Sequence, residues 1–169
     1  LGHIYLMSSS GGTAEAITKG TSWNMLPRFS PDGEKILFTS DRSGSDDLWV
    51  QNIKTGNMKN VSKMDIPVHQ GTWSTDGKHV FGTALNMKVR HPVYRFNMYG
   101  KKQEIIPAGS RSPVNHFAMH PTNNLIYFSH GDGPLYRSGD RIKTYNIQNG
   151  EIKTYVDRAG GAANPTLSQ

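Results

Sequence analysis

The chain has 169 residues, of which 35% are hydrophobic and 19% are charged, so it has the composition of a folded globular domain and not of a disordered segment. Its net charge of +6 comes from basic residues that are scattered and form no basic arm or face, which argues against nucleic acid as a partner. No apolar run reaches the roughly 18 residues of a membrane span, and the absence of cysteine excludes disulfides and thiolate chemistry.

Two short strands come first in the chain. Residues 4–9 have the apolar and β-prone character of a strand, and a glycine turn leads into a more polar strand over residues 12–18. Both segments have counterparts later in the chain in the same order. They are therefore predicted to be the closing half of a repeated unit.

A complete copy of that unit follows. Residues 28–33 (RFSPDG) predict a hairpin turn, in which Asp caps the turn and Gly takes the left-handed conformation. Strands are predicted after it over residues 35–39, 48–53 and 56–61. Two further copies place turns at 72–77 and 118–123, buried strands at 79–83 and 124–129, third strands at 93–98 and 142–147, and polar edge strands at 100–105 and 150–155.

The spacing of the copies indicates the fold. Ser30 and Ser74 are 44 residues apart, and Ser74 and His120 are 46 apart, which is the length of a four-stranded propeller blade. We predict an all-β fold, a β-propeller fragment of about three and a half to four four-stranded antiparallel blades. The predicted division is residues 1–20 (two closing strands), 21–63, 64–108 and 109–157 (blades), and 158–169 (first strand of another blade).

The segment from Leu26 to Val61 resembles the TolB-type, WD-like β-propeller repeat. It has the aromatic-Ser-Pro-Asp-Gly turn, an Ile-x-Phe strand, an Asp-Arg-x-Gly loop and a Leu-Trp strand. The resemblance implies a periplasmic or secreted protein in which the propeller is a non-catalytic scaffold for protein–protein interaction. The alternative that it implies is the accessory, substrate-gating propeller of an amidohydrolase-related or prolyl-oligopeptidase-like enzyme whose catalytic domain is absent from this chain.

Both ends of the chain interrupt the predicted repeat. An open run of blades leaves edge strands and apolar faces unpaired. We therefore expect a fragment, with the remaining blades of the same propeller or a second copy of the chain completing the ring. A separate protein partner is the other expectation.

The sequence contains no convincing catalytic or metal-binding motif. His116 and His120 have the spacing of a zinc-binding helix, but the residues around them predict a strand entering a turn. Calcium is the remaining cofactor alternative, through Asp46, Asp47, Asp132 and Asp140, although these lack a fixed ligand spacing. No serine lies in a Gly-x-Ser-x-Gly elbow. We therefore predict no catalytic, cofactor or metal residues and no enzymatic activity of this chain by itself.

The predicted blades offer two places for binding. Residues 25–28, 69–72 and 114–117 belong to first strands and are expected to line a central channel. The loops between second and third strands are expected to lie together on one face. The candidate binding residues on that face are Asp41, Arg42, Arg90, His91, His130, Asp132 and Arg137.

Overall fold

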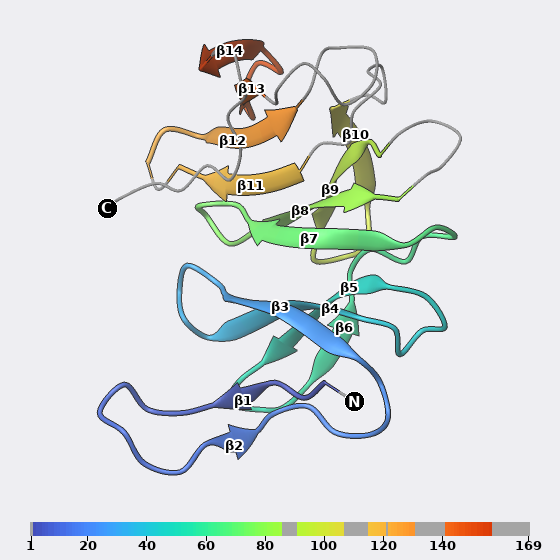
Figure 1. Cartoon of the computed structure of the whole chain (residues 1–169), viewed down its shortest axis with the longest axis vertical. Coiled ribbons are helices and arrows are strands. Elements are labelled where there is room, and N and C mark those ends of the chain that lie inside the picture. The colour runs from blue at the N-terminus through green and yellow to red at the C-terminus, as the bar shows by residue number, and fades with distance from the viewer. Residues whose placement is uncertain (1, 86–90, 107–114, 121, 131–140, 157–169) are drawn as a thin grey trace.

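A computed structural model of the chain (Figure 1) describes residues 2–85, 91–106, 115–120, 122–130 and 141–156. The regular structure of these residues consists of strands, which form one two-stranded and three four-stranded antiparallel sheets. The predicted all-β propeller fold is confirmed. The part of the chain that the structure describes holds no helix that could cross a membrane.

Each four-stranded sheet is built from consecutive strands, as in a propeller blade. The N-terminal sheet consists of β1 (Tyr5–Leu6) and β2 (Glu15–Ala16). Blade 1 consists of β3 (Asn24–Phe29), β4 (Lys35–Ser40), β5 (Asp47–Asn52) and β6 (Met58–Asn60). Blade 2 consists of β7 (Val68–Trp73), β8 (His79–Ala84), β9 (Val93–Asn97) and β10 (Lys102–Ile106). Blade 3 consists of β11 (Asn115–Met119), β12 (Leu125–His130), β13 (Arg141–Asn146) and β14 (Ile152–Val156).

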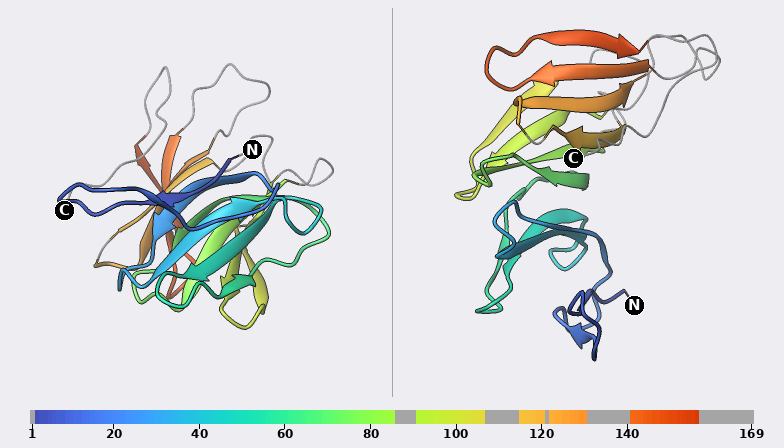
Figure 2. Two further views of the ribbon diagram at one scale, coloured as in Figure 1. Left: turned by 90° about the horizontal axis from the view of Figure 1, so that it is seen from below. Right: turned by 90° about the vertical axis from the view of Figure 1, so that its left-hand side faces the viewer.

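The sheets follow one another in chain order along the long axis of the molecule (Figure 1), and the right-hand view of Figure 2 shows the same succession from the side. The first strands are neighbours, because β7 contacts both β3 and β11. They are therefore the inner strands around which the blades are arranged.

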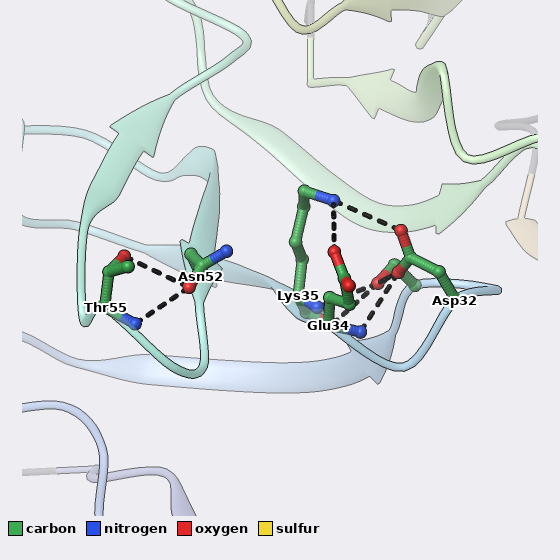
Figure 3. Close-up of polar contacts among 6 residues, drawn as sticks. Asp32, Glu34, Lys35, Asn52 and Thr55 are labelled. Atoms are coloured by element: carbon green, nitrogen blue, oxygen red, sulfur yellow. Dashed lines mark hydrogen bonds and ion pairs between the residues drawn. The ribbon is translucent and has the colours of Figure 1, made fainter.

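The turn between the first two strands of blade 1 is fixed by side chains (Figure 3). The hydroxyl of Ser30 donates to Oδ1 of Asp32 at 2.5 Å and accepts the N–H of Lys35 at 2.9 Å. The same Asp32 oxygen accepts the N–H of Glu34 at 3.0 Å, and Oδ2 pairs with the Lys35 ammonium at 3.2 Å. Gly33 has a φ of 72°, which glycine adopts without strain. The Ser-Pro-Asp-Gly sequence is therefore a self-contained hydrogen-bonded turn.

Blade 2 repeats this turn, and blade 3 builds it differently. The hydroxyl of Ser74 donates to Asp76 at 2.6 Å and accepts the N–H of His79 at 2.9 Å. In blade 3 His120 stands where the other copies have serine, and its ring Nδ1 accepts the N–H of Thr122 at 3.2 Å. The positive φ, 55°, is at Asn124, one residue later than the glycine of the other copies. The third copy thus has a turn of the same length with different side chains and a different backbone conformation.

Asparagine fixes the turn between the third and fourth strands in all three blades. Oδ1 of Asn52 accepts the N–H and hydroxyl of Thr55 at 2.8 and 3.0 Å (Figure 3). Asn97 and Asn146 accept N–H groups of their own turns at 2.9 and 2.8 Å. The sequence identified only the glycines of these turns, because an Asx turn depends on where the preceding strand ends.

Apolar side chains fill the space between neighbouring blades. The core between blades 1 and 2 includes Leu37, Leu48, Val50, Val61, Val68, Trp73, Val80, Ala84 and Phe96. The core between blades 2 and 3 includes Phe81, Val93, Ile105, Ile126, Phe128 and Tyr145. The indole N–H of Trp73 also donates to the carbonyl of Arg28 at 3.2 Å, which ties blade 2 to the inner strand of blade 1.

Two glycines of blade 2 allow blade 1 to approach closely. A Cβ at Gly82 would lie 2.6 Å from Cδ1 of Leu48 and 2.8 Å from Cγ1 of Val68. A Cβ at Gly71 would lie 2.8 Å from Cδ2 of Leu48 and 2.9 Å from Cδ2 of Leu37. No real Cβ tolerates such distances, so these positions require glycine for packing and not for backbone conformation.

We expect Gly82→Ala to lower the free energy of unfolding by about 1–3 kcal/mol, because the added methyl group overpacks the core. Denaturant unfolding of the variant and the parent measures the difference. The cost should shrink when Leu48 is also shortened to Ala, since this removes Cδ1. An equal cost in both backgrounds would contradict the proposed contact.

The turn of blade 1 predicts a dependence of stability on pH. Hydrogen bonds from Ser30 and from the Glu34 N–H lower the pKa of Asp32 from 3.8 to about 2. Because the folded pKa lies below the unfolded one, the stabilisation is complete above about pH 4 and is lost as the pH falls through about 2. Asp32→Asn should therefore lose less stability than the parent between pH 5 and pH 2, measured by urea unfolding. Glu15→Gln, which removes an exposed carboxylate elsewhere, is the control and should follow the parent.

Candidate binding face

The loops between second and third strands lie at the end of the blades where the next inner strand begins. The N–H of Val68 donates to the carbonyl of Asp46 at 2.7 Å, so the blade 1 loop meets the start of blade 2. The N–H of Leu85 likewise donates to the carbonyl of Pro67 at 2.7 Å. We call the end formed by residues 22–25, 41–46, 67–70 and 91–92 the loop face. The two turns of Figure 3 lie at the opposite end of the blade 1 sheet.

Asp41 attaches its loop to the segment that enters β3. Its Oδ1 accepts the N–H of Trp23 at 2.8 Å, and its own N–H donates to the carbonyl of Trp23 at 3.4 Å. The carbonyl of Asp41 accepts the N–H of Gly44 at 2.9 Å. The backbone of Trp23 is thereby fixed, while half of its side chain, 50%, remains exposed.

Arg42 is held within the protein by groups from three strands. Its guanidinium lies over the rings of Phe38 and Trp49, with centroid distances of 5.3 and 5.1 Å. It donates to Oδ1 of Asn24 at 2.6 Å and to the hydroxyl of Ser40 at 3.1 Å. Burial is the main effect on its pKa and lowers it, while the charge of Asp41 raises it. Arg42 therefore stabilises the loop face with most of its donors already engaged.

The other candidate residues lie along the same end of blades 2 and 3. His91 precedes β9, has a φ of 60°, and its buried Nδ1 lacks a hydrogen-bond partner among the described residues. His130 ends β12, where its ring meets the edge of Phe128 at 6.2 Å. Arg90, Asp132 and Arg137 lie outside the described residues. The structure thus brings Asp41 and Arg42 together on one loop and places His91 and His130 on the corresponding ends of the next two blades.

A contact between an imidazole and a carboxylate that the sequence did not predict joins this face to the inner strand β7. Nε2 of His69 lies 2.8 Å from Oδ2 of Asp46, with both side chains about a quarter exposed. His69 is on β7 and Asp46 is on the loop before β5, 23 residues earlier. The pair forms because the backbone bond from Val68 to Asp46 draws the loop against the inner strand.

The acidic residues considered for calcium have other partners. Asp47 is buried, and its carboxylate accepts hydrogen bonds from Ser43 at 2.7 Å, Asn60 at 2.8 Å and Ser62 at 2.5 Å. Asp46 pairs with His69 as described above. Asp132 and Asp140 lie outside the described residues. Among the residues that the structure describes, no group of three or more His, Asp or Glu is placed to hold a metal ion.

Each inner strand has a β-bulge at the equivalent place in its pairing with the second strand. The register shifts between Met25 and Arg28 in β3, between His69 and Thr72 in β7, and between Asn115 and Ala118 in β11. Leu26 and Gln70 occupy the first two bulges, each with a φ of 54°. Bulges redirect side chains, so Leu26 is 45% exposed although it lies in a strand. His116 lies in β11 and His120 follows directly after it, so the two histidines are not on a helix.

The chain matches a known family over nearly its whole length. The sequence model of the family described as TolB beta propeller domain matches residues 2–169. The Tol-Pal system protein TolB of Bordetella pertussis is 39% identical over 57 residues, which are 33% of this chain and 13% of that protein. The uncharacterized peptidase YuxL of Bacillus subtilis is 28% identical over 167 residues, which are 98% of this chain and 23% of that protein. The chain thus spans less than a quarter of either relative.

Solved structures share the same fold. A putative TolB from Agrobacterium tumefaciens superposes with a TM-score of 0.74 at 20% identity, over 90% of this chain and 55% of that one. TolB from Acinetobacter baumannii gives a TM-score of 0.70 at 24% identity, over 90% and 37% of the two chains. A prolyl endopeptidase gives 0.67 at 14% identity, over 95% and 27%.

We expect Arg42→Lys to lower the free energy of unfolding by about 1–2 kcal/mol, because lysine cannot replace both the ring contacts and the two hydrogen bonds. Thermal and urea unfolding measure the change. The control is Lys19→Arg, an exchange at an exposed position. If Arg42 were an unattached surface side chain, its substitution would change stability by less than about 0.5 kcal/mol, as expected for the control.

Proposed function

Because the chain belongs to the TolB β-propeller domain family, we propose that it is a non-catalytic interaction module that binds a protein partner through the loop face. The observation that carries this proposal is the presentation of Trp23. Two hydrogen bonds to Asp41 fix its backbone, and its indole lies beside Gly2 while half of the side chain remains exposed. A rigid, exposed Trp is the kind of residue that contributes most to protein interfaces.

The surroundings of Trp23 support the same role. Leu26 is exposed on the adjoining bulge, and Asp41 and the Asp46–His69 pair add polar groups around the apolar side chains. An apolar anchor with a polar rim is the usual anatomy of a protein interface. Because Arg42 and Asp41 fix the loop before any partner arrives, little conformational entropy is lost on binding.

The second candidate function is that of an accessory propeller in a hydrolase. It is favoured by the extent of the match to the Bacillus subtilis peptidase, which covers 98% of this chain, whereas the Bordetella pertussis TolB match covers 33%. In that case the loop face would meet a catalytic domain of the same polypeptide and control substrate access. Hydrolysis of peptide anilides by the full-length protein would favour this function over the scaffold.

We also propose that the protein acts in the periplasm or is secreted, as part of a larger polypeptide that supplies further blades. Membership of the TolB family supports this proposal, as does the difference in length between this chain and its relatives. Fractionation of cells that express the full-length gene tests the location.

We expect Trp23→Ala to weaken partner binding at least tenfold, which corresponds to about 1.4 kcal/mol. A photo-crosslinking amino acid at the exposed Thr21 first identifies the partner in cells, and calorimetry with the purified partner then gives the affinity. Tyr99→Ala is the matched control, because Tyr99 is 88% exposed on a turn at the opposite end of blade 2. Equal losses for Trp23→Ala and Tyr99→Ala, or no crosslink from Thr21, would contradict the proposal.

A further inference from the structure

Blade 2 contains a basic hollow on its outer strands, at the end opposite the loop face. Its volume is about 210 Å³. It is lined by His79 on β8, Arg95 and Asn97 on β9, and Lys101, Lys102 and Gln103 at β10. The side chains that this lining offers are a guanidinium, the ammonium of Lys101, one imidazole and two amides, and the six residues include no acid. Lys102 pairs with Phe96, so its side chain belongs to the other face of the sheet.

Strand register explains how these side chains meet. His79 lies opposite Asn97, and Arg95 lies between Phe81 on one side and Gln103 on the other. Directly paired residues share a face of the sheet, so all five are on the same face. Phe81 packs in the core with Ile126 and Phe128 of blade 3. The hollow is thus on the face of blade 2 that looks toward blade 3, further out than the apolar core.

The positive charge of the hollow comes from Arg95 and Lys101, and the guanidinium of Arg95 is oriented. Arg95 donates through Nη2 to Oε1 of Gln103 at 2.5 Å, which fixes the guanidinium and leaves its other N–H groups for a ligand. The pKa of His79 is lowered, first by burial and then by the charge of Arg95. Asp76, the acid nearest in the blade 2 turn, is engaged with the hydroxyl of Ser74 at 2.6 Å.

The other two blades show that the fold does not require these charges. The position of Arg95 opposite β8 is held by Val50 in blade 1, where it is buried in the core, and by Thr144 in blade 3. The position of Lys101 is held in blade 3 by Glu151, whose carbonyl accepts the equivalent backbone hydrogen bond. Only blade 2, among the described residues, combines cations at both positions.

We propose that this hollow binds a phosphate monoester group. A phosphate monoester carries a charge of about −1.5 to −2 and three acceptor oxygens, which matches the guanidinium of Arg95, the ammonium of Lys101 and the two amides. A single carboxylate would leave most of these donors and charges without a partner. The phosphate is carried either by a small molecule or by a phosphorylated side chain, since the hollow is larger than one phosphate group.

Calorimetry with four probes tests the proposal: inorganic phosphate, O-phosphoserine, a phosphoserine pentapeptide and the same peptide with glutamate. We expect the phosphoserine peptide to bind at least tenfold tighter than the glutamate peptide. O-phosphoserine binding as tightly as the peptide would identify a small-molecule source, and a tighter peptide would identify a phosphorylated side chain. Absence of binding by all phosphate probes, or equal binding of the glutamate peptide, would overturn the proposal.

Variants separate this site from general attraction to a basic protein. Arg95→Gln and, independently, Lys101→Glu in the exposed turn should each weaken phosphoserine binding at least tenfold. The control is Lys19→Gln combined with Lys54→Gln, which lowers the net charge at exposed positions outside the hollow. A loss of the same size in this control would overturn the proposal. Trp23→Ala should leave phosphate binding unchanged, so the two binding proposals can fail independently.

Discussion

The packing of Leu48 and Leu37 on the glycine positions of blade 2 sets the distance between the first two blades. Because Gly71 and Gly82 have no side chain, the leucines lie directly against strand backbone, and the inner strand β7 is drawn close to blade 1. That approach lets the N–H of Val68 reach the carbonyl of Asp46. The contact between Asp46 and His69 follows from it, so the form of the loop face depends on a contact in the core.

On the side of blade 1 that faces the N-terminal sheet, a cation and not a glycine occupies the corresponding space. The strand position of Gly82, opposite Tyr94, is held in blade 1 by Phe38, opposite Trp49. There the space beside the sheet is filled by the Arg42 guanidinium over both rings. Because the guanidinium also bonds to Asn24, which donates to the carbonyl of Gly2, this contact connects the loop face to the N-terminal sheet.

The sequence predicted the strands, their order and the turns, because glycine, Asp and alternating apolar residues determine these locally. The sequence did not predict the contacts between blades. Asp46 and His69 have no local signal that pairs them. The sequence placed Arg42 among the candidate binding residues but did not show its bond to Asn24, which lies 18 residues earlier. The basic hollow was also missed, since Arg95 and Lys101 meet only through the register of two strands.

The connections at one end of the blades have a constant length, and those at the other end differ in length between blades. The turn between the first and second strands has five residues in every blade (30–34, 74–78 and 120–124), since its side-chain hydrogen bonds fix its length. The loop between the second and third strands has six, eight and ten residues (41–46, 85–92 and 131–140). A surface connection outside the strand ladder can lengthen without disturbing the sheet. The connections therefore differ in length between blades at the loop face, where Trp23 lies.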